Sequence, residues 1–225
     1  MTLTLTRSEK MLGGVYLLLQ MLVIPFAVTL LCTGLGNPSE ALINLICFFL
    51  NALLAAVVFR RLLVRSWRSA ARDWRQTLSV AVKGFGLYWA INIAITAAIL
   101  TLRPDFANAN DAGVNAMIDE YPVLMTLAVI FMAPLAEECL FRGWIFIGLS
   151  QRSIPLAYAV SCGLFAAAHL VGYVGSYDPV SLVLCLLQYL GPSFVLCRIC
   201  QRSDSLAAPL ALHMFINALG CIFLR

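Results

Sequence analysis

Apolar residues occur along the chain in long runs that short polar segments separate, and this pattern predicts helices that cross a membrane. A helix needs about 20 mostly apolar residues to span the hydrocarbon core of a bilayer. The runs that approach or exceed this length cover residues 11–32, 40–59, 77–102, 122–149, 155–171, 180–200 and 206–224. We therefore predict that residues 1–225 form a single all-α domain, a polytopic membrane helical bundle of about seven transmembrane helices.

The amino-acid composition strengthens this interpretation. Of the 225 residues, 62% are hydrophobic and only 12% are charged. A soluble domain carries about 25% charged residues, so the surplus of apolar side chains must face lipid. The lipid bilayer is thus the first partner that we expect, and the protein should be an integral membrane protein.

Basic residues cluster between the second and third apolar runs, together with Trp67 and Trp74. The cluster consists of Arg60, Arg61, Arg65, Arg68, Arg72 and Arg75. Arginine interleaved with tryptophan is typical of an amphipathic helix that lies at the lipid interface. The same arginines serve as a topology signal, so we expect no nucleic-acid partner.

The distribution of the basic residues predicts the orientation of the chain. If the N-terminus is cytoplasmic, the inner segments hold 11 Lys and Arg residues and the outer segments hold two, leaving aside Lys83 and Arg142 within the runs. Cytoplasmic segments carry such an excess of positive charge. We therefore expect a cytoplasmic N-terminus, a C-terminus on the outside, and an acidic outer loop at residues 103–121.

Three charged residues, Glu137, Glu138 and Arg142, interrupt the fourth apolar run. An ionisable group at bilayer depth costs about 2.5–3.5 kcal/mol on insertion scales and is a functional-site hypothesis by default. The only two histidines, His169 and His213, occur in the fifth and seventh runs. At about 1.5 Å per helical residue, these histidines and Glu137 come to similar depths near the middle of the bilayer. Polar groups on three helices thus reach one level, as a buried site requires.

Helical spacing separates the two glutamates. Glu138 and Arg142 are four residues apart, in the order that favours pairing. Glu137 is rotated by about 100° from its neighbour and has no such partner. We therefore predict that Arg142 holds Glu138 ionised, whereas Glu137 can take a proton from water. Pro134, earlier in the run, frees the carbonyl of Ile130 and can bend the helix.

Two structural alternatives stay open for these residues. The three charged residues could form a network of salt bridges between helices that has no catalytic role. His213 and Asn217, which are four residues apart on one helix face, could be polar contacts that hold helices together, as in many membrane bundles.

Three motifs occur in order across the second half of the chain. They are Glu137-Glu138 with Arg142 four residues after the second glutamate, Phe165-x-x-x-His169, and His213-x-x-x-Asn217. In this combination the sequence resembles the CPBP family of intramembrane proteases. That family includes the Rce1-like type II CAAX prenyl endopeptidases and bacterial proteins linked to bacteriocin maturation or immunity. The resemblance covers residues 122–224.

The resemblance implies a helical bundle with a cavity open to the cytoplasmic side. It also implies hydrolysis of a peptide bond in a membrane-associated protein or peptide, by a water molecule that a glutamate activates. In the family pattern Glu137 is the general base, and His169 helps to hold or polarise the water. His213 and Asn217 would stabilise the oxyanion, and the ion pair after Glu137 would orient it. The residues expected to act are thus Glu137, His169, His213 and Asn217, with Glu138 and Arg142 in support.

No cofactor is expected, but zinc is an alternative. Glu137, His169 and His213 form a possible zinc set of two histidines and one carboxylate. We favour hydrolysis without a metal because Glu137 would otherwise have to act both as ligand and as base. With zinc bound, Glu138 could supply the base instead.

Two other classes of function compete with a protease. A non-catalytic membrane scaffold or a bacteriocin-immunity protein could retain the motif residues for structure. A small transporter could use Glu137 as a proton relay, but no pair of Gly/Pro-broken segments in matching halves supports it. The short chain resembles the bacterial branch of the family. By that analogy it lies in the inner (plasma) membrane of a bacterial cell and takes leader peptides or peptide pheromones as substrates.

Overall fold

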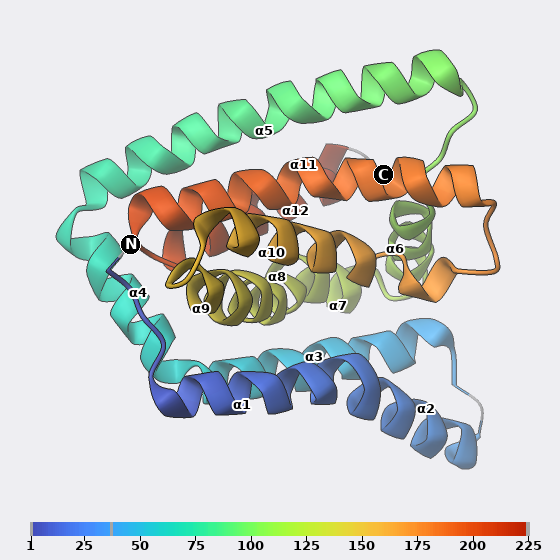
Figure 1. The fold of residues 1–225 in the computed structure, drawn as a ribbon. Coiled ribbons are helices and arrows are strands. Elements are labelled where there is room, and N and C mark those ends of the chain that lie inside the picture. The colour runs from blue at the N-terminus through green and yellow to red at the C-terminus, as the bar shows by residue number, and fades with distance from the viewer. Residues whose placement is uncertain (1, 37, 224–225) are drawn as a thin grey trace.

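The computed structural model describes residues 2–36 and 38–223, and most helices in this part of the chain run side by side as one bundle (Figure 1). Among these described residues, five helices are long and apolar enough to cross a membrane. They are Arg7–Leu35, Glu40–Val58, Trp74–Leu102, Pro122–Ser150 and Pro179–Ser203. Two shorter apolar helices, Ile154–Ala168 and Ala207–Phe223, accompany them. The predicted all-α membrane bundle is therefore confirmed.

The first half of the chain encloses the second half. Its helices are α1 (Arg7–Leu18), α2 (Ile24–Leu35), α3 (Glu40–Val58), α4 (Arg60–Arg72) and α5 (Trp74–Leu102), and the π-helical segment Leu19–Val23 joins α1 to α2 without a break. In Figure 1, α1 to α3 lie below the helices of the second half and α5 lies above them. The candidate site residues, all in the second half, are thereby placed between two helical layers.

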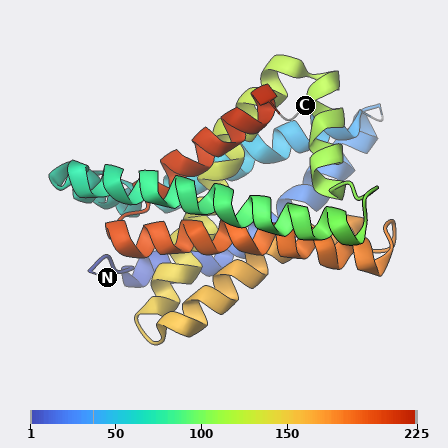
Figure 2. The same cartoon turned by 90° about the horizontal axis from the view of Figure 1, so that it is seen from above.

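The second half contains the central helix of the bundle. Its elements are α6 (Ala109–Glu120), α7 (Pro122–Leu127), α8 (Ala133–Glu137), α9 (Ile147–Ser150), α10 (Ile154–Ala168), α11 (Pro179–Ser203) and α12 (Ala207–Phe223). α7, α8 and α9 form one continuous helix, and its side chains Leu140, Phe141 and Phe146 are at most 1% exposed. α5 lies along α11 when the bundle is seen from above (Figure 2). A Cβ at Gly191 would lie 2.6 Å from Cγ2 of Ile91, so glycine permits this close approach.

The basic cluster forms α4, which lies across the ends of α3 and α5 at the same end of the bundle as the N-terminus (Figure 1). Nη2 of Arg65 lies 2.7 Å from Oε2 of Glu9, a carboxylate that is only 3% exposed. Nη1 of Arg65 donates to the backbone carbonyl of Thr4 at 3.0 Å. Trp67 and Trp74 are more than half exposed, at 55% and 58%. This end of the bundle therefore presents arginine and tryptophan outward.

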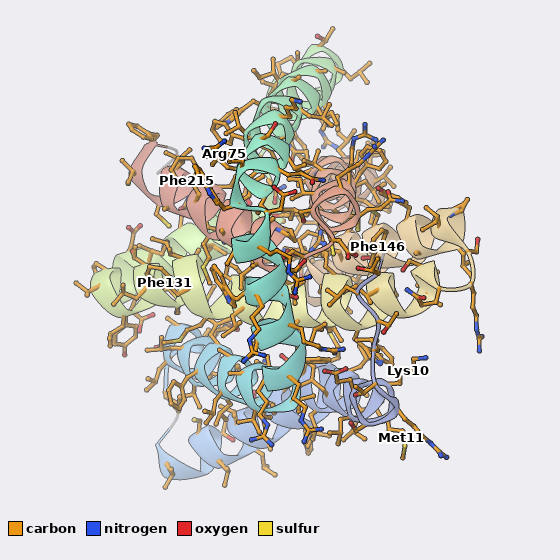
Figure 3. All side chains as sticks on the ribbon, turned by 90° about the vertical axis from the view of Figure 1, so that its left-hand side faces the viewer. Lys10, Met11, Arg75, Phe131, Phe146 and Phe215 are labelled. Atoms are coloured by element: carbon orange, nitrogen blue, oxygen red, sulfur yellow. The ribbon has the colours of Figure 1, made fainter. Side chains whose placement is uncertain are left out.

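The same end, viewed in Figure 3, shows how the apolar side chains divide between core and surface. Phe146 lies inside the bundle and is fully buried. Met11, Phe131 and Phe215 lie at its outside, with exposures of 67%, 50% and 49%. Large apolar side chains on the outside of a helical bundle are what a lipid environment requires.

Two segments differ from what the sequence predicts. Residues 103–121, expected as an outer loop, contain α6, because the side chain of Asn108 accepts two backbone N–H groups and caps a helix there. α10 has 15 residues and ends just before His169. It is therefore about 22 Å long and shorter than the hydrocarbon core. Residue 224, the expected end of the last span, lies outside the described residues.

The loop before α11 is fixed to α5 by an ion pair at the end of the bundle away from α4. Oδ1 of Asp178, the N-cap of α11, accepts the backbone N–H of Ser181 at 3.0 Å and lies 3.1 Å from Nη1 of Arg103. Hydrogen bonds from Ser181 and Arg103, together with the positive charge of Arg103, hold the pKa of Asp178 below its usual range. This pair is half exposed, in contrast to the buried charges of the central helix.

Candidate active site

The central helix departs from α-helical geometry on both sides of α8. The segments Ala128–Met132 and Glu138–Phe146 are π-helical, so their N–H groups bond to carbonyls five residues back. Such turns are rare and occur frequently at functional sites. The second segment begins at the glutamate pair, which places the charged motif where the backbone is unusual.

The π register also changes which carbonyl loses its partner at Pro134. The N–H of Ala133 donates to the carbonyl five residues back, so the missing N–H of Pro134 leaves the Val129 carbonyl without a helical donor. In an α-helical register it would have been the carbonyl of Ile130. Nδ2 of Asn217 donates to the Val129 carbonyl at 2.9 Å and satisfies it. Asn217 thus ties α12 to the central helix just before the glutamates.

Glu138 and Arg142 form a fully buried ion pair. Nη1 of Arg142 donates to Oε1 of Glu138 at 2.8 Å, and both side chains have 0% exposure. Nη2 of Arg142 donates to Oγ of Ser193 on α11 at 2.9 Å, and its guanidinium carbon lies 4.3 Å from the ring centroid of Phe165 on α10. The arginine therefore connects the central helix with α11 by a charge-assisted hydrogen bond and with α10 by a cation–π contact.

His213 of α12 lies between the two glutamates. Its Nδ1 is 2.8 Å from Oε1 of Glu138, and its Nε2 is 3.8 Å from Oε2 of Glu137. His169 approaches Glu137 from α10, with 4.0 Å between its Nε2 and Oε1 of Glu137. Glu137 is 19% exposed whereas Glu138 is fully buried. Glu137 is therefore the more accessible carboxylate of the pair.

The hydrogen-bond partners of the two rings define their tautomers. Nδ1 of His169 lies 2.8 Å from the carbonyl oxygen of Phe165, and a carbonyl can only accept, so this nitrogen carries the hydrogen. The carboxylate of Glu138 imposes the same arrangement on Nδ1 of His213. Each neutral ring thus directs the lone pair of Nε2 towards Glu137. Distances of 3.8 and 4.0 Å exceed a direct hydrogen bond, and one bridging water molecule spans such a separation.

The structure brings together most of the residues that the sequence singles out. Glu137, His169 and His213 form one cluster, and Glu138 joins it through His213. Asn217 is adjacent along α12, but one of its two amide hydrogens is used by the central helix. The roles proposed for these residues rest on this geometry and remain predictions.

Two contacts of the site were not found from the sequence. Ser193 binds Arg142, and the ring of Tyr189 stacks on His169 with 4.3 Å between centroids and 23° between planes. Both residues lie on α11, in a run that the sequence presents as one apolar span. Their polar groups beside Pro192, a proline inside a helix, were the available signal.

The alternative zinc set does not fit this arrangement. Nitrogen and oxygen ligands of a tetrahedral zinc ion are 2.0–2.1 Å from the metal and therefore about 3.3–3.4 Å apart. The two contacts of Glu137 with the histidines are longer, at 3.8 and 4.0 Å. Within residues 2–36 and 38–223, no three His, Cys, Asp or Glu side chains are grouped so that they could hold a metal ion. We therefore derive no catalytic step through zinc.

A comparison with protein families finds a match in the second half of the chain. Residues 119–219 match the family model described as Type II CAAX prenyl endopeptidase Rce1-like. This range begins at the end of α6 and includes both glutamates, both histidines and Asn217. No curated protein and no solved structure matches the chain.

Proposed function

Because residues 119–219 belong to the Rce1-like family of type II CAAX prenyl endopeptidases, we propose that this integral membrane protein cleaves peptides with a water molecule activated by Glu137. Membership of this family implies a protease embedded in the membrane that acts on a peptide or protein. The observation that supports Glu137 as the base is its position. It is the partly exposed carboxylate of the pair, and the Nε2 atoms of two histidines face its two oxygens.

The proposed reaction begins with a water molecule between Glu137 and His169. Such a water donates one hydrogen to the carboxylate and one to Nε2 of His169, which leaves its oxygen lone pairs free. As this oxygen bonds to the scissile carbonyl carbon, Glu137 takes a proton and the carbonyl oxygen becomes an oxyanion. The C–N bond then breaks, and Glu137 returns the proton to the leaving amine. The carboxylate is ionised again at the end of the cycle.

In the proposed reaction, His213 and Asn217 stabilise the oxyanion. When both of its nitrogens carry hydrogen, His213 can donate from Nε2 to the oxyanion while its Nδ1 stays bound to Glu138 at 2.8 Å. Asn217 retains a second amide hydrogen beyond its bond to Val129. Removing one oxyanion donor typically lowers the rate by about 10²–10³-fold. Arg142 holds Glu138 in place in this scheme through their 2.8 Å ion pair.

The function can be tested with purified protein in proteoliposomes. Peptides of one sequence would be offered with a farnesyl anchor on a C-terminal Cys-aliphatic-aliphatic-X segment, with an N-terminal palmitoyl anchor, or with none, and the products read by mass spectrometry. We expect cleavage of an anchored peptide and little of the free one, because the site lies within the bilayer. We also expect activity to persist with EDTA or 1,10-phenanthroline, because we propose catalysis without a metal.

Two results of this experiment would contradict the proposal. If folded protein cleaves no peptide, the alternative of a non-catalytic scaffold or immunity protein gains support. If chelators abolish cleavage and zinc restores it, the reaction needs a metal and Glu137 is not the base that we propose.

We also propose that the protein lies in a bacterial plasma membrane with α4 on the cytoplasmic side. The exposed arginines of α4 and the N-terminal segment share one end of the bundle, which agrees with the bias of basic residues to the inside. Alkaline phosphatase fused after residue 225 should be active and fluorescent protein fused there should be dark. Fusions after residue 203, at the end of α11, should show the opposite pattern. Phosphatase activity only at residue 203 would reverse the orientation.

A further inference from the structure

α6 covers the place where the short helix α10 ends. The buried residues Ala109 of α6, Leu170 after α10 and Cys185 of α11 form a small apolar core, with exposures of 1%, 6% and 1%. Residues 170–178 continue without α-helix from the level of His169. Such backbone within a membrane protein must be covered by protein or line a cavity. α6 supplies part of this cover.

Polar side chains at the N-terminal end of α6 bind two neighbouring residues of α11. Oη of Tyr189 donates to Oδ1 of Asp111 at 2.9 Å and accepts from Nδ2 of Asn110 at 2.9 Å. One residue earlier on α11, Oε1 of Gln188 accepts from Nδ2 of Asn108 at 2.8 Å. The hydroxyl end of Tyr189 is therefore held by two adjacent residues at the start of α6.

The other end of Tyr189 reaches the candidate active site. Its ring stacks nearly parallel on the imidazole of His169, with a centroid distance of 4.3 Å. The ring of Phe165 contacts the same imidazole at 4.5 Å, and the Phe165 carbonyl accepts from its Nδ1. The imidazole turns about its Cα–Cβ and Cβ–Cγ bonds; one hydrogen bond at Nδ1 restrains this turning in part, and a stacked ring restricts it further. The direction of Nε2 towards Glu137 thus depends on the stack.

We propose that Tyr189 is a positioning residue for His169, anchored by Asp111 and Asn110, so that α6 is part of the catalytic apparatus. This inference rests on the proposed function for its effect on catalysis, but the positioning itself is independent of any substrate. It assigns α6, which lies almost entirely outside the family match, a role in the site.

The presence of only two histidines makes this positioning observable by NMR. Protein with isotope-labelled histidine, purified through a tag without histidine, should give two sets of imidazole signals, and His213→Gln assigns them. A stacked tyrosine shifts the ring protons of His169 upfield. We expect Tyr189→Leu to remove this shift. Tyr189→Phe keeps the ring but loses its hydrogen bonds to Asn110 and Asp111, so its shift should lie between those of wild type and Tyr189→Leu.

Tyr158 on α10 provides a matched control. It is also partly buried, donates its hydroxyl hydrogen to Oε1 of Gln201 at 2.8 Å and packs against Phe146 at 5.0 Å. Tyr158→Leu therefore removes an aromatic contact and a hydrogen bond of the same kinds. It should leave the His169 signals unchanged. An equal change of these signals in Tyr158→Leu and Tyr189→Leu, or none in Tyr189→Leu, would overturn the proposal.

The cleavage assay adds a second readout. In Tyr189→Leu we expect kcat to fall by about tenfold to a hundredfold, the size of effect seen when a catalytic group is misplaced, with KM changed by less than about twofold. Tyr189→Phe, which keeps the stacked ring but loses its hydrogen bonds to α6, should have a kcat between those of wild type and Tyr189→Leu. If the wild-type protein cleaves nothing, the proposed function fails while the NMR result still decides the positioning. If cleavage occurs but kcat of Tyr189→Leu equals that of wild type, positioning by Tyr189 has no catalytic role.

Discussion

Replacing Glu137 with glutamine should lower kcat/KM for peptide cleavage by at least about 10³-fold, because an amide cannot take the proton of the attacking water. Thermal unfolding should shift little, because Glu137 is 19% exposed and its contacts with the histidines are 3.8 and 4.0 Å long. Both quantities would be measured on the same proteoliposome preparation. The combination of lost activity and retained stability is what separates a catalytic carboxylate from a structural one.

Two further variants make this comparison specific. Glu120→Gln changes an exposed glutamate at the end of α6 and should leave both activity and stability unchanged. Glu138→Gln removes the charge that Arg142 and His213 share, so we expect it to lower stability as well as activity. A wild-type rate of cleavage by the Glu137→Gln variant would contradict the proposed role of Glu137 as the base. If Glu137→Gln loses as much stability as Glu138→Gln, the alternative of a structural network of salt bridges would be supported instead.

Replacing Arg142 with methionine should lower the free energy of unfolding by about 3–5 kcal/mol, the usual effect of leaving one member of a buried ion pair alone. Glu138 has 0% exposure and could not recover the lost partner from solvent. The variant also loses the hydrogen bond to Ser193 and the contact with the ring of Phe165. Denaturant unfolding in mild detergent measures this change.

The double variant Glu138→Gln/Arg142→Met tests the cause of that loss. It removes both charges, so it should be more stable than Arg142→Met alone. Arg103→Met is the control for an arginine at the surface, since Arg103 pairs with Asp178 in a half-exposed ion pair and should contribute little. Equal stability of Arg142→Met and the double variant would show that buried charge is not the cause. An unfolding free energy of Arg142→Met within error of wild type would contradict the expectation entirely.

The helical membrane bundle could be predicted from the sequence because lipid imposes a simple requirement on it. Each span must be apolar along its length and must satisfy its backbone hydrogen bonds internally, so the apolar runs alone identify the helices. The pairing of Glu138 with Arg142 was equally accessible, because residues four apart on a helix meet whatever surrounds them.

Two features of the helices could not be predicted from the apolar runs: the end of α10 and the presence of α6. α10 ends before His169 although apolar residues continue to Val171. α6 forms in a segment whose polar composition suggested a loop, because Asn108 caps it and Tyr189 and Gln188 of a distant helix bind its first turn. The amino-acid composition of a segment indicates whether it favours solvent, but it does not reveal hydrogen bonds that side chains of other helices make with that segment.

The charged residues of the fourth apolar run show which features of the site the sequence determines and which the tertiary structure adds. The sequence by itself determined that Glu137 and Glu138 point in different directions and that two histidines lie at their level. Only the packing of α8, α10 and α12 decided that His213 contacts both glutamates and that Glu137 is the one left exposed. Helical spacing acts over four residues, whereas Glu138 and His213 are 75 residues apart, and no periodicity in the chain specifies how helices so far apart meet.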